Sequence, residues 1–212
     1  KQYDTRIFVN VCGRSVSDYV EVVEKLADQP VDMLEINVSC PNVKHGGIAF
    51  GQDPKCLFDI TREIKAKAKQ PIIMKLSPNV TDIAEMARAA EAAGSDALSL
   101  INTITGMKID IHKRTFALAN RTGGLSGPAI KPVAVRMVYQ AANAVKIPII
   151  GMGGIADAED AIEFMLAGAT GIAVGAMNFV NPYTTVEVVR GIEAYMQQYG
   201  IENLSEIIGT VR

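Results

Sequence analysis

Six short apolar runs alternate along the chain with six amphipathic stretches. The apolar runs cover residues 7–11, 33–38, 71–76, 97–101, 148–151 and 171–175. Their nearly continuous hydrophobicity is typical of parallel strands that are covered on both faces. The amphipathic stretches cover residues 16–28, 54–69, 81–93, 129–145, 157–167 and 183–198, and their period predicts helices. Regular alternation of strand and helix predicts an α/β fold with a parallel sheet.

Polar and glycine residues mark the predicted starts and ends of several helices. Ser15 and Asp157 stand just before helical stretches and are predicted N-caps, with Asp18 in the first turn after Ser15. Gly94 and Gly168 follow helical stretches, where a left-handed residue commonly ends a helix. These four positions therefore set the expected helix limits.

Two architectures fit this alternation, an open doubly wound sheet and a (β/α)8 barrel. The barrel is favoured because several runs end in polar or glycine residues, and barrel enzymes draw their sites from the ends of many strands. Gly153-Gly154 and Gly175 follow the last two runs, where barrels commonly bind phosphate, whereas a doubly wound fold carries its glycines after the first strand. We therefore predict a single TIM-barrel domain over residues 1–212. Counting back from these two final strands, it would hold about six of the eight units, with the two N-terminal units missing.

Residues 104–127 interrupt the alternation of predicted strands and helices with a long segment that carries several glycines. Loops of this length in a compact domain are usually functional. We expect a short hairpin here that covers the mouth of the barrel.

Composition excludes several classes of function. The net charge is −2 and the 21 basic residues are spread along the chain, which argues against a nucleic-acid surface. No apolar run is long enough to predict a membrane-spanning helix. The three cysteines lack CxxC spacing and the two histidines lie far apart, so no metal site is predicted. Sparse cysteines favour the reducing cytoplasm, and Cys12 and Cys56 are expected to be small buried side chains.

Lys75 stands at the end of an otherwise apolar run. A lysine in such a run is paired, functional or reaches solvent. It could act as a Schiff-base nucleophile, or as a fixed positive charge beside a cofactor that gains negative charge. The glycines at 153, 154 and 175 expose backbone N–H groups before predicted helices, which favours an anion such as phosphate over a simple turn.

Amide side chains gather at the ends of other runs. Asn10, Asn37, Asn42 and Asn102-Thr103 lie at or just after predicted strands. Amides offer both donors and acceptors, which suits a planar pyrimidine-type substrate, although asparagine is also common in turns. Cys40 lies among them and is either a base or nucleophile, or a small buried side chain. His45 and His112 are expected on the surface.

Four motifs resemble one enzyme family along the whole chain. Residues 37–47, read as Asn-Val-Ser-Cys-Pro-Asn-Val-Lys-His-Gly-Gly, resemble the active-site loop of class 1B dihydroorotate dehydrogenases. Residues 75–83, 122–132 and 151–154 are similar to further motifs of that family.

The resemblance implies an FMN-dependent enzyme of pyrimidine biosynthesis that oxidises dihydroorotate to orotate, with Cys40 as the base. It also implies a partner subunit that carries FAD and a 2Fe–2S cluster and reduces NAD⁺, around a homodimer core in a heterotetramer. The implied FMN contacts are Asn10, Asn37, Lys75, Ile101, Gly127, Gly153, Gly154, Gly175 and Ala176. The implied substrate contacts are Asn37, Asn42, Asn102 and Thr103.

The chain departs from the family pattern in two respects. The family has two further N-terminal units, which supply a second lysine near the flavin, and Ala176 stands where threonine is usual. An alternative is a uracil-reducing domain like that of dihydropyrimidine dehydrogenase, which shares the cysteine loop and the run 51–54. A Schiff-base aldolase that uses Lys75 and a non-catalytic assembly surface are more distant alternatives.

Overall fold

A computed structural model describes residues 3–39 and 50–211. Its main sheet has six parallel strands in the order β1-β2-β3-β4-β9-β10. The strands are β1 (Phe8–Val11), β2 (Met33–Asn37), β3 (Ile72–Lys75), β4 (Ala97–Leu100), β9 (Ile149–Met152) and β10 (Gly171–Ala173). Each lies within two residues of the limits expected from its apolar run, so the strand prediction is confirmed.

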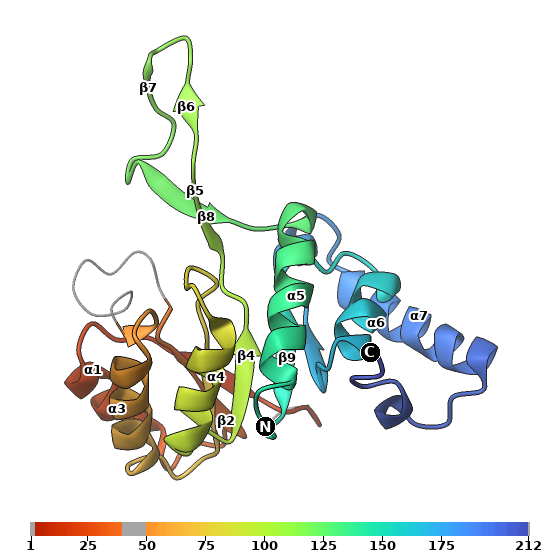
Figure 1. The fold of residues 1–212 in the computed structure, drawn as a ribbon, viewed down its shortest axis with the longest axis horizontal. Helices are drawn as coiled ribbons and strands as arrows, with labels where there is room; N and C mark the ends of the chain where they lie inside the picture. Colours follow the sequence, from red (N-terminus) through yellow and green to blue (C-terminus); the bar gives the residue numbers. More distant parts are fainter. Residues whose placement is uncertain (1–2, 40–49, 212) are drawn as a thin grey trace.

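A helix follows each strand of this sheet. The helices are α1 (Val16–Leu26), α3 (Pro54–Lys65), α4 (Ile83–Ala92), α5 (Lys131–Ala142), α6 (Ala158–Leu166) and α7 (Thr184–Tyr199), with short 3₁₀ turns η1 (Pro128–Ile130), η2 (Ala176–Phe179) and η3 (Leu204–Glu206). Each helix contacts the next along the chain, and Figure 1 shows them side by side around the sheet. The curled parallel sheet with its outer helices is a partial TIM barrel, as predicted.

The predicted caps are present. The Ser15 side chain accepts from the Asp18 N–H, and the Asp18 carboxylate accepts from the Ser15 N–H, which completes a capping box. Asp157 caps α6. Gly94 and Gly168 have φ values of 97° and 117° just after their helices, a conformation that a side chain disfavours.

The core lies between the sheet and the helices. In β2, Leu34 and Ile36 are fully buried, whereas Glu35 and Asn37 are only partly buried. Since side chains alternate along a strand, the second pair faces the inside of the curled sheet. In β2, alternation therefore separates a packed outer face from an inner face that carries Glu35 and Asn37.

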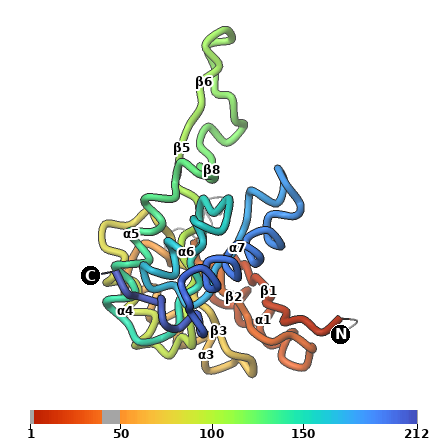
Figure 2. The backbone as a smooth tube through the Cα atoms, turned by 90° about the vertical axis from the view of Figure 1, so that its right-hand side faces the viewer, coloured from red at the N-terminus to blue at the C-terminus, as the bar shows by residue number. Residues whose placement is uncertain are grey.

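Residues 104–125 form a long β arm. Strand β5 (Ile104–Met107) pairs antiparallel with β8 (Thr122–Leu125), and β6 (Ile109–Asp110) pairs with β7 (Thr115–Phe116). Figures 1 and 2 show that the arm projects away from the body of the molecule. The expected hairpin is present, but its outer part extends outward instead of lying over the barrel mouth.

No helix within the described ranges, 3–39 and 50–211, is long and apolar enough to cross a membrane.

Candidate functional site

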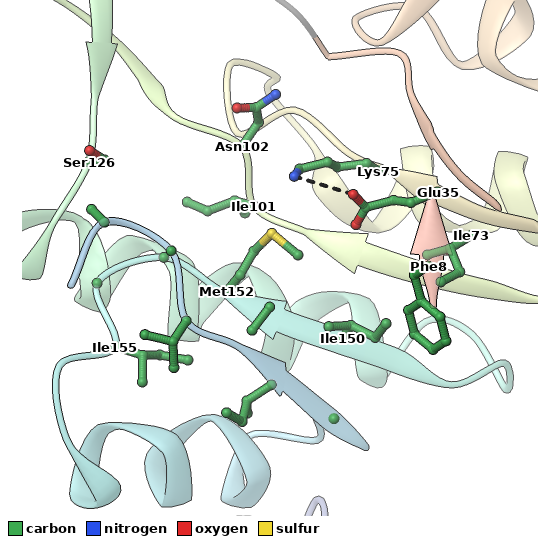
Figure 3. A pocket seen from close by; sticks show the side chains of 18 of the residues that line it. Phe8, Glu35, Ile73, Lys75, Ile101, Asn102, Ser126, Ile150, Met152 and Ile155 are labelled. Carbon is green, nitrogen blue, oxygen red and sulfur yellow. Dashed lines mark ion pairs between the residues drawn. The ribbon is translucent and has the colours of Figure 1, made fainter. Parts of the chain in front are cut away.

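An open cavity of about 950 Å³ lies inside the curled sheet and extends to the carboxyl ends of its strands (Figure 3). Its volume suits a drug-sized or cofactor-sized ligand. Nine residues singled out from the sequence line it: Lys75, Ile101, Asn102, Thr103, Gly127, Gly153, Gly154, Gly175 and Ala176. The fold thus brings together residues from five separate segments of the chain.

Much of the cavity wall is apolar. Ile101, Ile150, Met152 and Ile155 line it together, and Figure 3 labels all four among the side chains around the cavity. Apolar walls with a few polar groups are typical of sites that bind small molecules and cofactors.

Asn10 and Asn37 do not line the cavity, but hydrogen bonds connect them to Asn102, which does. Asn37 donates to Oδ1 of Asn10 at 3.4 Å, and Asn102 donates to Oδ1 of Asn37 at 3.4 Å. Asn102 also donates to the Ser39 hydroxyl at 2.6 Å. Three members of the expected amide cluster, Asn10, Asn37 and Asn102, therefore form one network that joins β1, β2 and the end of β4.

Two residues that support this network were not singled out from the sequence. The hydroxyl of the fully buried Tyr19 donates to the Asn37 carbonyl at 2.8 Å. Asn79 donates to the Thr103 carbonyl at 3.2 Å and accepts from the Thr105 N–H at 3.0 Å. Asn79 thereby fixes the start of the β arm beside the cavity.

The cysteine predictions have mixed outcomes. Cys40 and Asn42 lie outside the described residues, as does His45. Cys12 and Cys56 are exposed, so the expectation that both are buried was wrong. Cys12 follows the edge strand β1, and Cys56 lies in the first turn of α3. Neither side chain faces the core. A hydrogen bond with Asp53, with a smaller contribution from partial desolvation, raises the pKa of the Cys56 thiol. His112 is exposed, as predicted.

The glycines at the carboxyl ends of the strands differ in what surrounds them. A Cβ atom on Gly154, whose φ is 86°, would lie 2.9 Å from the Gly127 carbonyl oxygen, so the two loops pack backbone to backbone. A Cβ atom on Gly127 or Gly175 would meet nothing within 4 Å. These two glycines therefore expose bare backbone to open space in the cavity, which allows a ligand to approach it closely.

An ion cluster lies behind these loops. The Lys131 ammonium is 2.6 Å from carboxylate oxygens of both Asp160 and Glu163. Hydrogen bonds to Asp160 and then Glu163 raise the pKa of Lys131. Burial raises the pKa of Asp160, but hydrogen bonds from Lys131 and the Ala156 N–H outweigh it and hold that pKa below its ordinary value.

The charged pair inside the cavity is Lys75 with Glu35, and Figure 3 shows the two side chains facing each other. The ammonium lies 3.5 Å from Oε2 of Glu35, and the side chains are 18% and 15% exposed. Glu35 was not singled out, although its position inside an apolar run is the same signal that identified Lys75. Within residues 3–39 and 50–211, no group of three or more His, Cys, Asp or Glu side chains is arranged to hold a metal ion.

Comparisons with known proteins agree on one family. The family model described as dihydroorotate dehydrogenase matches residues 1–196. The chain is 68% identical over 212 residues to the dihydroorotate dehydrogenase B (NAD⁺) catalytic subunit of Lachnoclostridium phytofermentans, covering 100% of this chain and 71% of the relative. It is 64% identical over 209 residues to the protein of the same name from Alkaliphilus oremlandii, covering 99% of this chain and 69% of the relative.

A solved structure supports the fold. The structure of DHODH from Eimeria tenella in complex with ferulenol superposes with a TM-score of 0.79 at 24% sequence identity. The match covers 95% of this chain and 61% of that chain. At this identity the likeness concerns the fold alone.

Proposed function

This chain belongs to the dihydroorotate dehydrogenase family, and from that premise we propose that it oxidises dihydroorotate to orotate at an FMN site inside the curled sheet. One observation carries the proposal. A single cavity is lined by the glycine loops, by Lys75 and by Asn102. The cavity therefore offers backbone for an anion, a cation for a ring that gains charge, and amides for a polar substrate.

The cavity fits FMN in its dimensions and its chemistry. Its volume of about 950 Å³ and its isoleucine-rich wall suit a flavin ring. The N–H groups at Gly153, Gly154, Gly175 and Ala176 would bind the phosphate, with Asn10, Asn37, Ile101 and Gly127 as the further flavin contacts. Lys75 would offset negative charge on the ring. When bound, FMN would accept a hydride from the substrate.

The substrate would be held by the amide network. Asn37, Asn42, Asn102 and Thr103 offer donors and acceptors that match the edge of a pyrimidine ring. Cys40 would remove the proton from C5 as the general base, while the hydride leaves C6. The hydrogen bonds among Asn10, Asn37 and Asn102 support this assignment, because they hold the amides in fixed orientations.

The relatives are named as NAD⁺-linked catalytic subunits, a name that points to a separate electron-transfer subunit. We accordingly propose that this chain works with a partner subunit that carries FAD and a 2Fe–2S cluster, around a homodimer of catalytic subunits. Residues 1–212 would then form one FMN domain of a cytoplasmic enzyme of pyrimidine biosynthesis.

The test is anaerobic addition of dihydroorotate to FMN-loaded protein. We expect the blue absorption of the flavin to bleach and orotate to appear in equal amount. Dihydrouracil serves as the comparison substrate. Faster bleaching with dihydrouracil than with dihydroorotate would contradict the proposal and favour the dihydropyrimidine dehydrogenase alternative. Failure to load FMN, together with a borohydride-trapped adduct on Lys75, would favour the aldolase instead.

A further inference from the structure

A carboxylate lies on the inner face of the sheet, among apolar residues. Glu35 is in the middle of β2, between the fully buried Leu34 and Ile36, and its own side chain is 15% exposed. Removing an ionised carboxylate from water costs free energy unless it is paired and hydrogen-bonded. The partners of Glu35 therefore determine what it does there.

Those partners come from the three strands nearest to β2 in the sheet order. Asn10 of β1 donates to Oε2 at 2.5 Å, and Ser99 of β4 donates to Oε1 at 2.7 Å. Lys75 of β3 lies 3.5 Å from Oε2. The strand register places Asn10 opposite Glu35 and Ser99 opposite Lys75. Both oxygens of this carboxylate are thus engaged, and together they join four adjacent strands.

The three distances are unequal, and the difference is informative. The two neutral side chains lie at short hydrogen-bond distances from the carboxylate. The ammonium lies farther away than the roughly 2.7–2.9 Å of a charge-assisted N–H···O bond. Glu35 therefore attracts Lys75 as a counter-ion without occupying all of its N–H donors. Lys75 lines the cavity and keeps donors for a ligand there.

We propose that Glu35 is a positioning residue for Lys75, and that its charge sets how strongly the cavity attracts the negative charge of a reduced flavin. The inference rests on the proposed function, because it takes FMN as the occupant. Glu35 fixes the ammonium at the cavity wall and offsets part of its charge. Asn10 and Ser99 hold the carboxylate and limit how closely it approaches Lys75.

This role predicts shifts of opposite sign for the two partners. Glu35→Gln removes the negative charge and leaves Lys75 uncompensated. We expect the ratio of the affinities for reduced and oxidised FMN to rise about tenfold, or about 30 mV for a two-electron couple. Lys75→Met should lower the same ratio. A residue that only stabilises the sheet would give no shift, or a shift in the direction of Lys75→Met.

The experiment is a redox titration of FMN in the holoenzyme against a reference dye, with the affinity for oxidised FMN measured separately by fluorescence quenching. Glu85→Gln, on the exposed side of α4, is the matched control for loss of one carboxylate and should leave the ratio unchanged. An unchanged or lowered ratio in Glu35→Gln overturns the inference. If that variant fails to fold, Ser99→Ala decides. It frees the carboxylate to approach Lys75 and should lower the ratio, so an unchanged ratio overturns the inference.

The outcome also separates this inference from the proposed function. Suppose that wild-type protein binds FMN and dihydroorotate bleaches it, but Glu35→Gln leaves the ratio of FMN affinities unchanged. That result contradicts only the role of Glu35 and leaves the proposed function intact. A wild-type protein that binds no FMN removes both.

Discussion

The ammonium of Lys131 and the carboxylate of Asp160 lie 2.6 Å apart and join the first turn of α5 to the first turn of α6. Each of these helices follows a loop that lines the cavity, one through Gly127 and the other through Gly153-Gly154. Because the two loops also pack backbone to backbone, the ion pair holds the Gly127 loop and the Gly153-Gly154 loop in register.

Asp160→Ala should lower the free energy of unfolding by about 1.5–3 kcal/mol, the range for a hydrogen bond to a charged group. The reason is that Asp160 is 13% exposed and also accepts from the Ala156 N–H. Glu163 is 46% exposed, so Glu163→Ala should cost less than about 1 kcal/mol. Urea unfolding of both variants measures the difference, and equal losses would contradict the assignment.

The same pair predicts a dependence of stability on pH. The folded pKa of Asp160 is lowered, so its contribution is present above the ordinary value of about 3.9 and is lost as pH falls through the lowered pKa. The folded pKa of Lys131 is raised, so its contribution is present below about 10.4 and is lost as pH rises through the raised pKa. The stability difference between wild type and Asp160→Asn should therefore be constant near neutral pH and shrink below about pH 4. Urea titrations across this range measure it, and a difference that persists in acid counts against the ion pair.

The strands and helices were predictable because burial and amphipathicity leave strong periodic signals. Leu34 and Ile36 are buried against the helices, and the apolar run that contains them predicts a strand. Ser15 and Asp157 were identifiable because capping chemistry is local, requiring only residues three positions apart. Lys75 was identifiable because a charge in an apolar run is costly unless it has a function or a partner.

The remaining features depend on contacts between distant segments. The two hydrogen-bond donors to the Glu35 carboxylate, Asn10 and Ser99, lie 25 and 64 residues away in the sequence, so their arrangement follows from the strand order. The outward course of the arm depends on the direction in which the chain leaves the end of β4, and no local sequence pattern indicates that direction. Cys12 and Cys56 were expected to be buried on the average behaviour of thiols, whereas their exposure follows from an edge strand and a helix start.

Gly175→Ala should weaken FMN binding without destabilising the fold. A Cβ atom there meets no protein atom within 4 Å, so the methyl group enters only the space proposed for the ligand. We expect a loss of about 1–3 kcal/mol in binding, as for overpacking of a filled site. Gly106→Ala on the β arm, where a Cβ atom would lie 3.7 Å from Leu125, is the control. Fluorescence titration measures the FMN affinity of both variants. Unchanged affinity in Gly175→Ala would show that the phosphate binds elsewhere.

Cys40→Ala should leave FMN binding intact and slow dihydroorotate oxidation by about 10²–10⁴-fold, the usual contribution of a positioned base. Cys40→Ser should recover part of the rate only at high pH, because a hydroxyl is a far weaker acid than a thiol whose ordinary pKa is about 8.5. Steady-state rates across pH test both variants, with Cys56→Ala as the control thiol. Retention of more than about a tenth of the wild-type rate in Cys40→Ala would assign the base to another residue.

Lys75→Met should slow flavin reduction while FMN still binds. Methionine keeps much of the length of the side chain but removes the charge that offsets the negative charge developing on the flavin ring. Losing one preorganised electrostatic partner typically costs about 10²–10³ in rate. The phosphate contacts are on separate loops, so the affinity for oxidised FMN should fall much less than the rate. Stopped-flow bleaching by dihydroorotate measures the rate, with Lys69→Met on the exposed surface as the matched control. A reduction rate equal to that of wild type would show that Lys75 does not stabilise the reduced ring, and the charge pair with Glu35 would then serve only the stability of the sheet.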